Sequence, residues 1–107
     1  MAFIKALLLS TLPPGGRKII EIKGEEIALF HRDEGVTAVS NICPHSGGAL
    51  GEGLLTDGDI VCPLHFWRFN LDSGRSIRPP GYRIKKYPVK LENGWIYLDL
   101  PEEETGK

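Results

Sequence analysis

Apolar and polar residues alternate along short runs of this chain, and these runs are separated by glycine, proline and acidic or amide residues. Alternation with a period of two over four to eight residues is typical of half-buried β-strands. No long segment keeps the 3.6-residue apolar period of an amphipathic helix. The pattern predicts strands at residues 3–8, 17–23, 27–31 and 36–41, joined by tight turns as an antiparallel meander.

The middle of the chain has a different character. Residues 42–78 are rich in Gly, Cys, His and Pro, and only residues 59–62 and 67–70 have the pattern of short strands. After the break at Pro79, two further strands are predicted at residues 85–91 and 95–100, joined by a Glu-Asn-Gly hairpin signal. We therefore expect an all-β domain over residues 1–107, a β sandwich or meander with an inserted lobe at about 42–78 and an acidic tail at 101–107.

Length and composition narrow the function. The 107 residues suit one domain, and the formal net charge of −1 argues against a nucleic-acid binder, which usually has a strong basic excess. The N-terminal apolar run is short and lacks a signal-peptide cleavage motif, and no segment approaches the roughly 18 apolar residues of a membrane span. We expect a soluble cytoplasmic protein, in which two cysteines indicate metal or redox chemistry more than a structural disulfide.

The insert contains two related pairs of metal-binding residue types. Cys43-Pro44-His45 and Cys62-Pro63-Leu64-His65 each place a thiolate and an imidazole on one short loop, a combination suited to iron or zinc. Proline stiffens each loop, and glycines at 47, 48, 51 and 53 let the backbone approach a bound centre closely.

Four interpretations of these pairs follow from the residues. The pairs could be coincidental, although they share spacing, proline and loop context. A Cys43–Cys62 disulfide leaves both histidines unexplained. A tetrahedral Cys2His2 zinc site, within an interaction module without a redox role, is compatible with the residue types, although zinc ribbons more often repeat C-x-x-C. A Rieske [2Fe–2S] cluster, in which two histidines replace two cysteines on one iron, accounts for all four residues.

From residue 12 to residue 100 the sequence resembles the Rieske ferredoxin family. The matching elements are the two cluster motifs, Gly51-Glu52-Gly53, the stretch from Trp67 to Gly74, and Tyr87-Pro88-Val89. The resemblance implies an antiparallel β fold with a protruding lobe that holds one [2Fe–2S] cluster per chain. It implies Cys43 and Cys62 as ligands of one iron and His45 and His65 as outermost ligands of the other. We find no nucleophilic triad, carboxylate pair or nucleotide motif, so we expect an electron carrier that is not catalytic alone.

The neighbours of the motif differ from those of the respiratory-complex Rieske proteins, which this chain also resembles. Those proteins have a disulfide between the cluster loops, where this chain has Gly48 and Leu64. They also have a serine and a tyrosine where it has Trp67 and Phe69. Hydrogen bonds to the sulfurs stabilise the reduced cluster, so their absence predicts a low-potential protein.

Phe66, directly after the second motif, replaces the glycine of most family members; a positive φ there would strain a phenylalanine. The resemblance implies a ferredoxin that passes electrons from an NAD(P)H-dependent flavin reductase to a terminal oxygenase. The residue at 66 favours the alternative, the small subunit of an assimilatory NAD(P)H nitrite reductase with a large sirohaem partner.

Charge is distributed unevenly along the chain. Residues 1–67 have a net charge of −3, residues 68–90 a net charge of +6, and residues 91–107 a net charge of −4. The basic segment is either a solvated face or a surface for an acidic partner, with Arg68, Arg83, Lys85 and Lys86 as candidate docking residues. His31 lies on a predicted strand away from both motifs, so we expect it not to be a ligand. Trp67 either shields the cluster or fills the core.

Overall fold

The computed structural model describes residues 2–43, 47–56, 58–64, 66–78 and 80–100. Within these residues eleven strands form three antiparallel sheets, and the helical segments are two short 3-10 turns, η1 (Leu9–Thr11) and η2 (Leu50–Glu52). The all-β prediction is confirmed. No helix in the described part of the chain has the length and apolar character needed to cross a bilayer.

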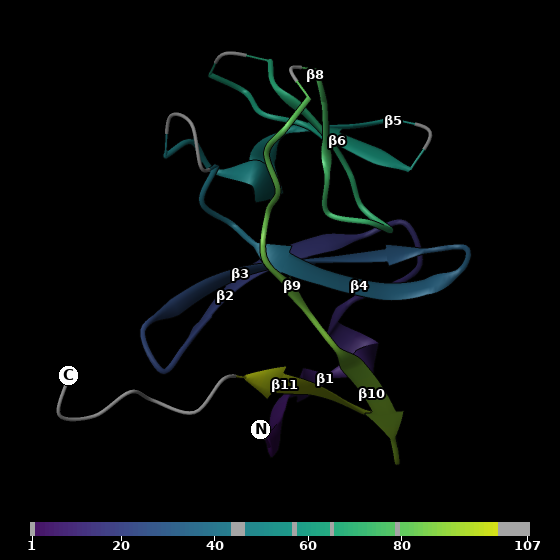
Figure 1. The fold of residues 1–107 in the computed structure, drawn as a ribbon. Coiled ribbons are helices and arrows are strands. Elements are labelled where there is room, and N and C mark those ends of the chain that lie inside the picture. The colour runs from purple at the N-terminus through teal and green to yellow at the C-terminus, as the bar shows by residue number, and fades with distance from the viewer. Residues whose placement is uncertain (1, 44–46, 57, 65, 79, 101–107) are drawn as a thin grey trace, which may run out of the picture.

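The central sheet has the order β2-β3-β4-β9, with β2 at Arg17–Ile22, β3 at Glu25–Arg32, β4 at Gly35–Ser40 and β9 at Lys86–Tyr87. Its strand β3 is buried on both faces. Ile27 and Leu29 belong to one hydrophobic core, whereas Ala28 and Phe30 belong to the other. Because successive side chains of a strand point to opposite faces, this apolar run places the central sheet between the two cores, in the middle of the molecule (Figure 1).

The predicted insert is a lobe with its own sheet, at the top of Figure 1. Its strand order is β5-β6-β7-β8, with β5 at Leu54–Thr56, β6 at Asp59–Val61, β7 at Arg68–Asn70 and β8 at Ser76–Arg78. The alternation pattern anticipated β6 and β7 but not β5 or β8. All four strands of this sheet are only three residues long, so alternation is a weak signal throughout the lobe.

The third sheet lies at the opposite end of the molecule, with the order β1-β11-β10 (Figure 1). It contains β1 (Ala2–Leu8), β10 (Val89–Glu92) and β11 (Trp95–Leu100). The expected hairpin is present, with φ of 53° at Asn93 and 79° at Gly94, as a type I′ turn requires. The expected meander is wrong at its first strand, because β1 pairs with β11, Ile4 opposite Leu98, and not with β2.

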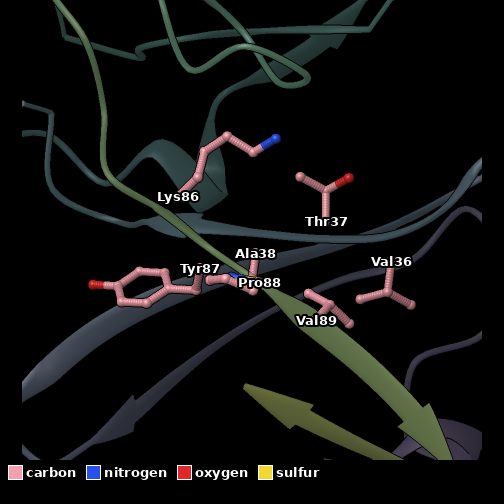
Figure 2. A pocket seen from close by; sticks show the side chains of 7 residues that line it. All are labelled: Val36, Thr37, Ala38, Lys86, Tyr87, Pro88 and Val89. Carbon is pink, nitrogen blue, oxygen red and sulfur yellow. The ribbon is translucent and has the colours of Figure 1, made fainter. Parts of the chain in front are cut away.

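The single strand predicted at residues 85–91 is two strands in two sheets. Tyr87 pairs with Ala38 of the central sheet, and Val89 pairs with Leu98 of the third sheet. Pro88 lies between them and has no N–H to donate to a ladder, so the pairing changes there. A shallow hollow beside this crossing is lined by scaffold side chains of β4, β9 and β10, with Lys86 and Thr37 at one rim (Figure 2).

Candidate metal centre

The two cysteine loops have the same backbone hydrogen bonds. In the first, the Cys43 carbonyl accepts from the Gly47 N–H at 2.8 Å, and the Cys43 N–H donates to the Gly48 carbonyl at 2.9 Å. In the second, the Cys62 carbonyl accepts from the residue four positions on, Phe66, at 3.0 Å, and its N–H donates five positions on, to Trp67, at 2.7 Å. The two loops thus share one pattern of backbone hydrogen bonds, and each begins with a cysteine.

Both cysteines lie inside one hydrophobic core. Their exposed fractions are 1% for Cys43 and 0% for Cys62, and they share this core with Leu50, Phe69 and Leu71. Neither cysteine is in a disulfide in the described structure, so the disulfide interpretation is wrong. Two loops that bring two cysteine sulfurs into one hydrophobic core suit a soft metal centre, because the thiolate is the form that ligates.

Glycine is required beside the second thiol. A Cβ at Gly48 would lie 2.9 Å from the Cys62 Sγ and 3.1 Å from Leu64 Cγ, which is closer than ordinary packing allows. The first loop therefore passes directly over the sulfur of the second, without space for a side chain between them. The contact also shows that positions 48 and 64 are neighbours in space.

The two histidines of the motif, His45 and His65, lie outside the described residues, as do Pro44 and Ser46. Their flanking residues are described: Cys43 and Gly47 bracket the first gap, and Leu64 and Phe66 bracket the second. The ligand set expected from the sequence is therefore half described.

A polar anchor that the sequence did not reveal holds the segment between the two loops. The Arg17 guanidinium donates to the carbonyls of Gly51 at 3.1 Å and Gly53 at 2.5 Å. The buried Asn41 amide oxygen accepts from the Gly51 N–H at 2.6 Å, and its NH2 group donates to Glu26 at 3.0 Å. Asn41 stands two residues before Cys43, but nothing in the sequence marks Arg17, because its contact with Gly53 spans 36 residues.

The comparison with protein families settles which kind of centre these loops belong to. Residues 3–88 match the model of the Rieske [2Fe–2S] domain, which covers both loops and the central sheet. The chain belongs to the Rieske family.

Three relatives illustrate the Rieske match. The ferredoxin component of the naphthalene 1,2-dioxygenase system of Pseudomonas aeruginosa is 34% identical over 99 residues, 92% of this chain and 95% of that protein. The ferredoxin of carbazole 1,9a-dioxygenase from Nocardioides aromaticivorans IC177 superimposes with a TM-score of 0.82 at 26% identity, over 92% and 97% of the two chains. A structure assigned as an NADH-dependent nitrite reductase small subunit from Mycobacterium tuberculosis has a TM-score of 0.80 at 28% identity, over 91% and 93%.

The described half of the site fits the Rieske cofactor. That cofactor is a [2Fe–2S] cluster with two cysteine ligands, and this chain contains two cysteines, both buried and neither in a disulfide. The contact between Gly48 and Leu64 supports the expectation that no loop disulfide stands there. Phe69 is fully buried beside the thiols, and Trp67 is partly buried with its ring 4.7 Å from that of Tyr82. Trp67 therefore packs against the core on the cluster side.

Phe66 has a left-handed backbone in this Rieske chain, with φ of 63°. Its counterpart in the first loop is Gly47, with φ of 77°. The positive φ that would strain a phenylalanine at this position is therefore present. The side chain of Phe66 is 72% exposed. The resulting strain is about 1–2 kcal/mol.

The remaining sequence candidates lie on the scaffold or in ion pairs. His31 Nδ1 is 2.7 Å from the Leu12 carbonyl, on β3 and away from the cysteine loops, as expected for a histidine that is not a ligand. Arg68 pairs with Asp59 at 2.7 Å, and Lys85 lies 3.5 Å from Glu25. Ion pairs within the chain thus offset part of the positive charge of residues 68–90.

Proposed function

We propose that this chain is a ferredoxin whose single [2Fe–2S] cluster is held by Cys43 and Cys62 on one iron and by His45 and His65 on the other. The observation that carries the proposal is the pair of matching loops, which bring two cysteine side chains into one core. Each loop also carries one histidine in its sequence, two residues after Cys43 and three after Cys62. This is the donor set of a Rieske centre.

The protein's own residues bind the group and limit the access of water to it. When bound, the cluster supplies a one-electron redox couple. The thiolates of Cys43 and Cys62 lie on the buried side, where Leu50, Phe69 and Leu71 exclude water. A hydrogen bond donated by Arg17 and one accepted by the Asn41 amide oxygen fix the intervening segment, so the two loops keep their spacing without a covalent link. Such fixed ligands suit electron transfer, which needs little rearrangement.

The direction of electron flow follows the related ferredoxins. The protein receives electrons from an NAD(P)H-dependent flavin reductase and delivers them one at a time to a terminal oxygenase. Support comes from the naphthalene dioxygenase relative, a ferredoxin component of nearly the same length. Trp67 and Phe69 supply no hydroxyl group, so we propose a low potential. The cytoplasmic location expected from the sequence stays a prediction.

A second function is favoured by one residue. Phe66 stands where dioxygenase ferredoxins usually have glycine, and the small subunits of assimilatory nitrite reductases often have another residue there. The Mycobacterium tuberculosis structure, at 28% identity, has the same fold and nearly the same length as this chain. In this alternative the chain transfers electrons within a complex with a large sirohaem subunit.

Reconstituted turnover distinguishes the two functions. The holo-protein is combined with an NAD(P)H-dependent flavin reductase and, separately, with a terminal oxygenase or a sirohaem nitrite reductase from the same organism. We expect NAD(P)H-driven oxygen consumption and product formation that stop when the chain is omitted. Nitrite consumption that depends on the chain, without oxygenase turnover, would assign it to nitrite reductase instead.

A further inference from the structure

The basic segment at residues 68–90 divides into partnered and unpartnered side chains. Arg68 and Lys85 have carboxylate partners, Lys90 lies 3.5 Å from Glu92, and Lys86 donates to the Asp72 carbonyl. Among the described side chains of this segment, Arg75 and Arg83 are exposed and have no carboxylate within ion-pair distance. Arg75 and Arg83 are therefore the exposed arginines of this segment, among its described side chains, whose charge no carboxylate offsets.

Arg75 and Arg83 face solvent side by side. They are the two partners of an isolated antiparallel bridge that follows the turn after β7. Side chains of residues directly opposite each other in an antiparallel pair project to the same face, with Cβ atoms about 4.5–5.5 Å apart. Like charges in that position repel, and a guanidinium cannot lose its proton to relieve the repulsion. An anionic group placed between the two side chains would neutralise it.

This arginine pair adjoins the second cysteine loop. Tyr82, directly before Arg83, is 51% exposed and packs against Trp67 in a tilted arrangement with ring centroids 4.7 Å apart. The Trp67 carbonyl accepts the hydrogen bond from the Cys62 N–H at 2.7 Å. The exposed part of Tyr82 thus lies at the edge of the arginine pair, and its ring connects this surface to the loop that carries Cys62.

We propose that Arg75, Tyr82 and Arg83 form a docking surface for a carboxylate-rich face of the protein that exchanges electrons with this chain. The inference rests on the proposed electron-transfer function. Arginine binds carboxylates through its planar fork, and arginine and tyrosine are both enriched at protein interfaces. The net charge of −1 shows that the attraction is local, because the chain as a whole would repel an acidic partner.

The test compares two redox proteins of opposite charge as electron acceptors. Reduced holo-protein is mixed in a stopped-flow instrument with acidic cytochrome b5 or with basic cytochrome c, at low and high salt. The variant Arg75→Glu/Arg83→Glu is compared with Lys18→Glu/Lys23→Glu, which changes the net charge equally on the exposed β2–β3 hairpin. We expect the arginine variant to reduce cytochrome b5 about tenfold more slowly at low salt and cytochrome c faster, since electrostatic steering changes association rates by at least that factor.

The control variant separates the patch from total charge. We expect Lys18→Glu/Lys23→Glu to change both rates much less, and high salt to remove the differences. Equal effects of the two double variants, or no effect of the arginine variant on cytochrome b5, would overturn the docking surface. Unmutated holo-protein that reduces neither cytochrome would instead contradict the proposed electron-transfer function, so the two failures are distinguishable.

Discussion

Phe66 combines an unfavourable backbone conformation with an exposed side chain. Its equivalent in the first loop is a glycine, which adopts a positive φ without steric cost. The phenylalanine ring is 72% exposed, so little burial offsets the strain. Strained residues that persist without a packing reason concentrate at functional sites, and this one directly follows His65 in the sequence.

Replacing Phe66 with glycine is expected to stabilise the protein. Relief of about 1–2 kcal/mol of left-handed strain exceeds the entropic cost of glycine, about 0.5–1 kcal/mol, so the unfolding free energy should rise by about 0.5–1 kcal/mol. Chemical denaturation of the holo-protein measures this. Phe66→Ala, which keeps the strain, is the control and should not stabilise the protein. A Phe66→Gly variant less stable than the original would show that the ring contributes packing energy.

Gly48 lies so close to the Cys62 sulfur that any side chain should disturb the site. Gly48→Ala places its Cβ 2.9 Å from that sulfur, and such overpacking costs about 1–3 kcal/mol. We expect lower cluster content per chain, measured from iron and visible absorbance. Gly47→Ala is the matched control, because no atom lies within 4 Å of its Cβ and only backbone strain is added. Equal cluster content in Gly48→Ala and the unmutated protein would contradict the close approach.

At the scale of elements, local pattern predicted most strands and the pairing of sequence neighbours, but not the short strands β5 and β8 or the partner of β1. The alternation around Ile20 and the apolar run from Ile27 to Phe30 mark β2 and β3, which are joined by a short hairpin. The pairing of β1 with β11 joins opposite ends of the chain, and no local signal specifies it. Both cysteines of the site could be predicted from motif spacing, whereas the Arg17 anchor depends on tertiary structure.

The strand β9 is fastened to the central sheet by a hydrogen bond from the Tyr87 hydroxyl to the Glu25 carboxylate. Burial and this carboxylate raise the pKa of Tyr87 above its ordinary value of 10.0. The folded state therefore holds this proton more tightly than the unfolded state, and stability should fall as pH rises above about 10.

Tyr87→Phe tests this interaction. We expect it to remove the latest step from a tyrosinate absorbance titration and to make stability less dependent on pH above about 10, because the group that the unfolded state ionises first is gone. Tyr97→Phe, which removes a tyrosine without the Glu25 contact, is the control. A late step that survives in Tyr87→Phe would show that another tyrosine is the shielded one.

At the scale of the whole molecule, we expect the side chains around the two cysteine loops to set the redox potential of the cluster. The structure places fully buried Phe69 and the partly buried Trp67 beside the cysteine loops, and neither side chain carries a hydroxyl group. We expect a midpoint potential below about 0 mV, within a family range of roughly −150 to +300 mV. A redox titration monitored by visible absorbance measures it. A midpoint above roughly +200 mV would mean that other donors stabilise the reduced cluster.

The central claim is that two cysteines and two histidines hold a Rieske cluster, and EPR spectroscopy of the reduced protein tests it most directly. We predict a red-brown oxidised protein and, after reduction, a signal with an average g below the free-electron value, because histidine ligates one iron. His45→Cys and His65→Cys should each abolish that signal. A colourless, EPR-silent protein containing zinc, or a Rieske signal unchanged in either histidine variant, would contradict the account.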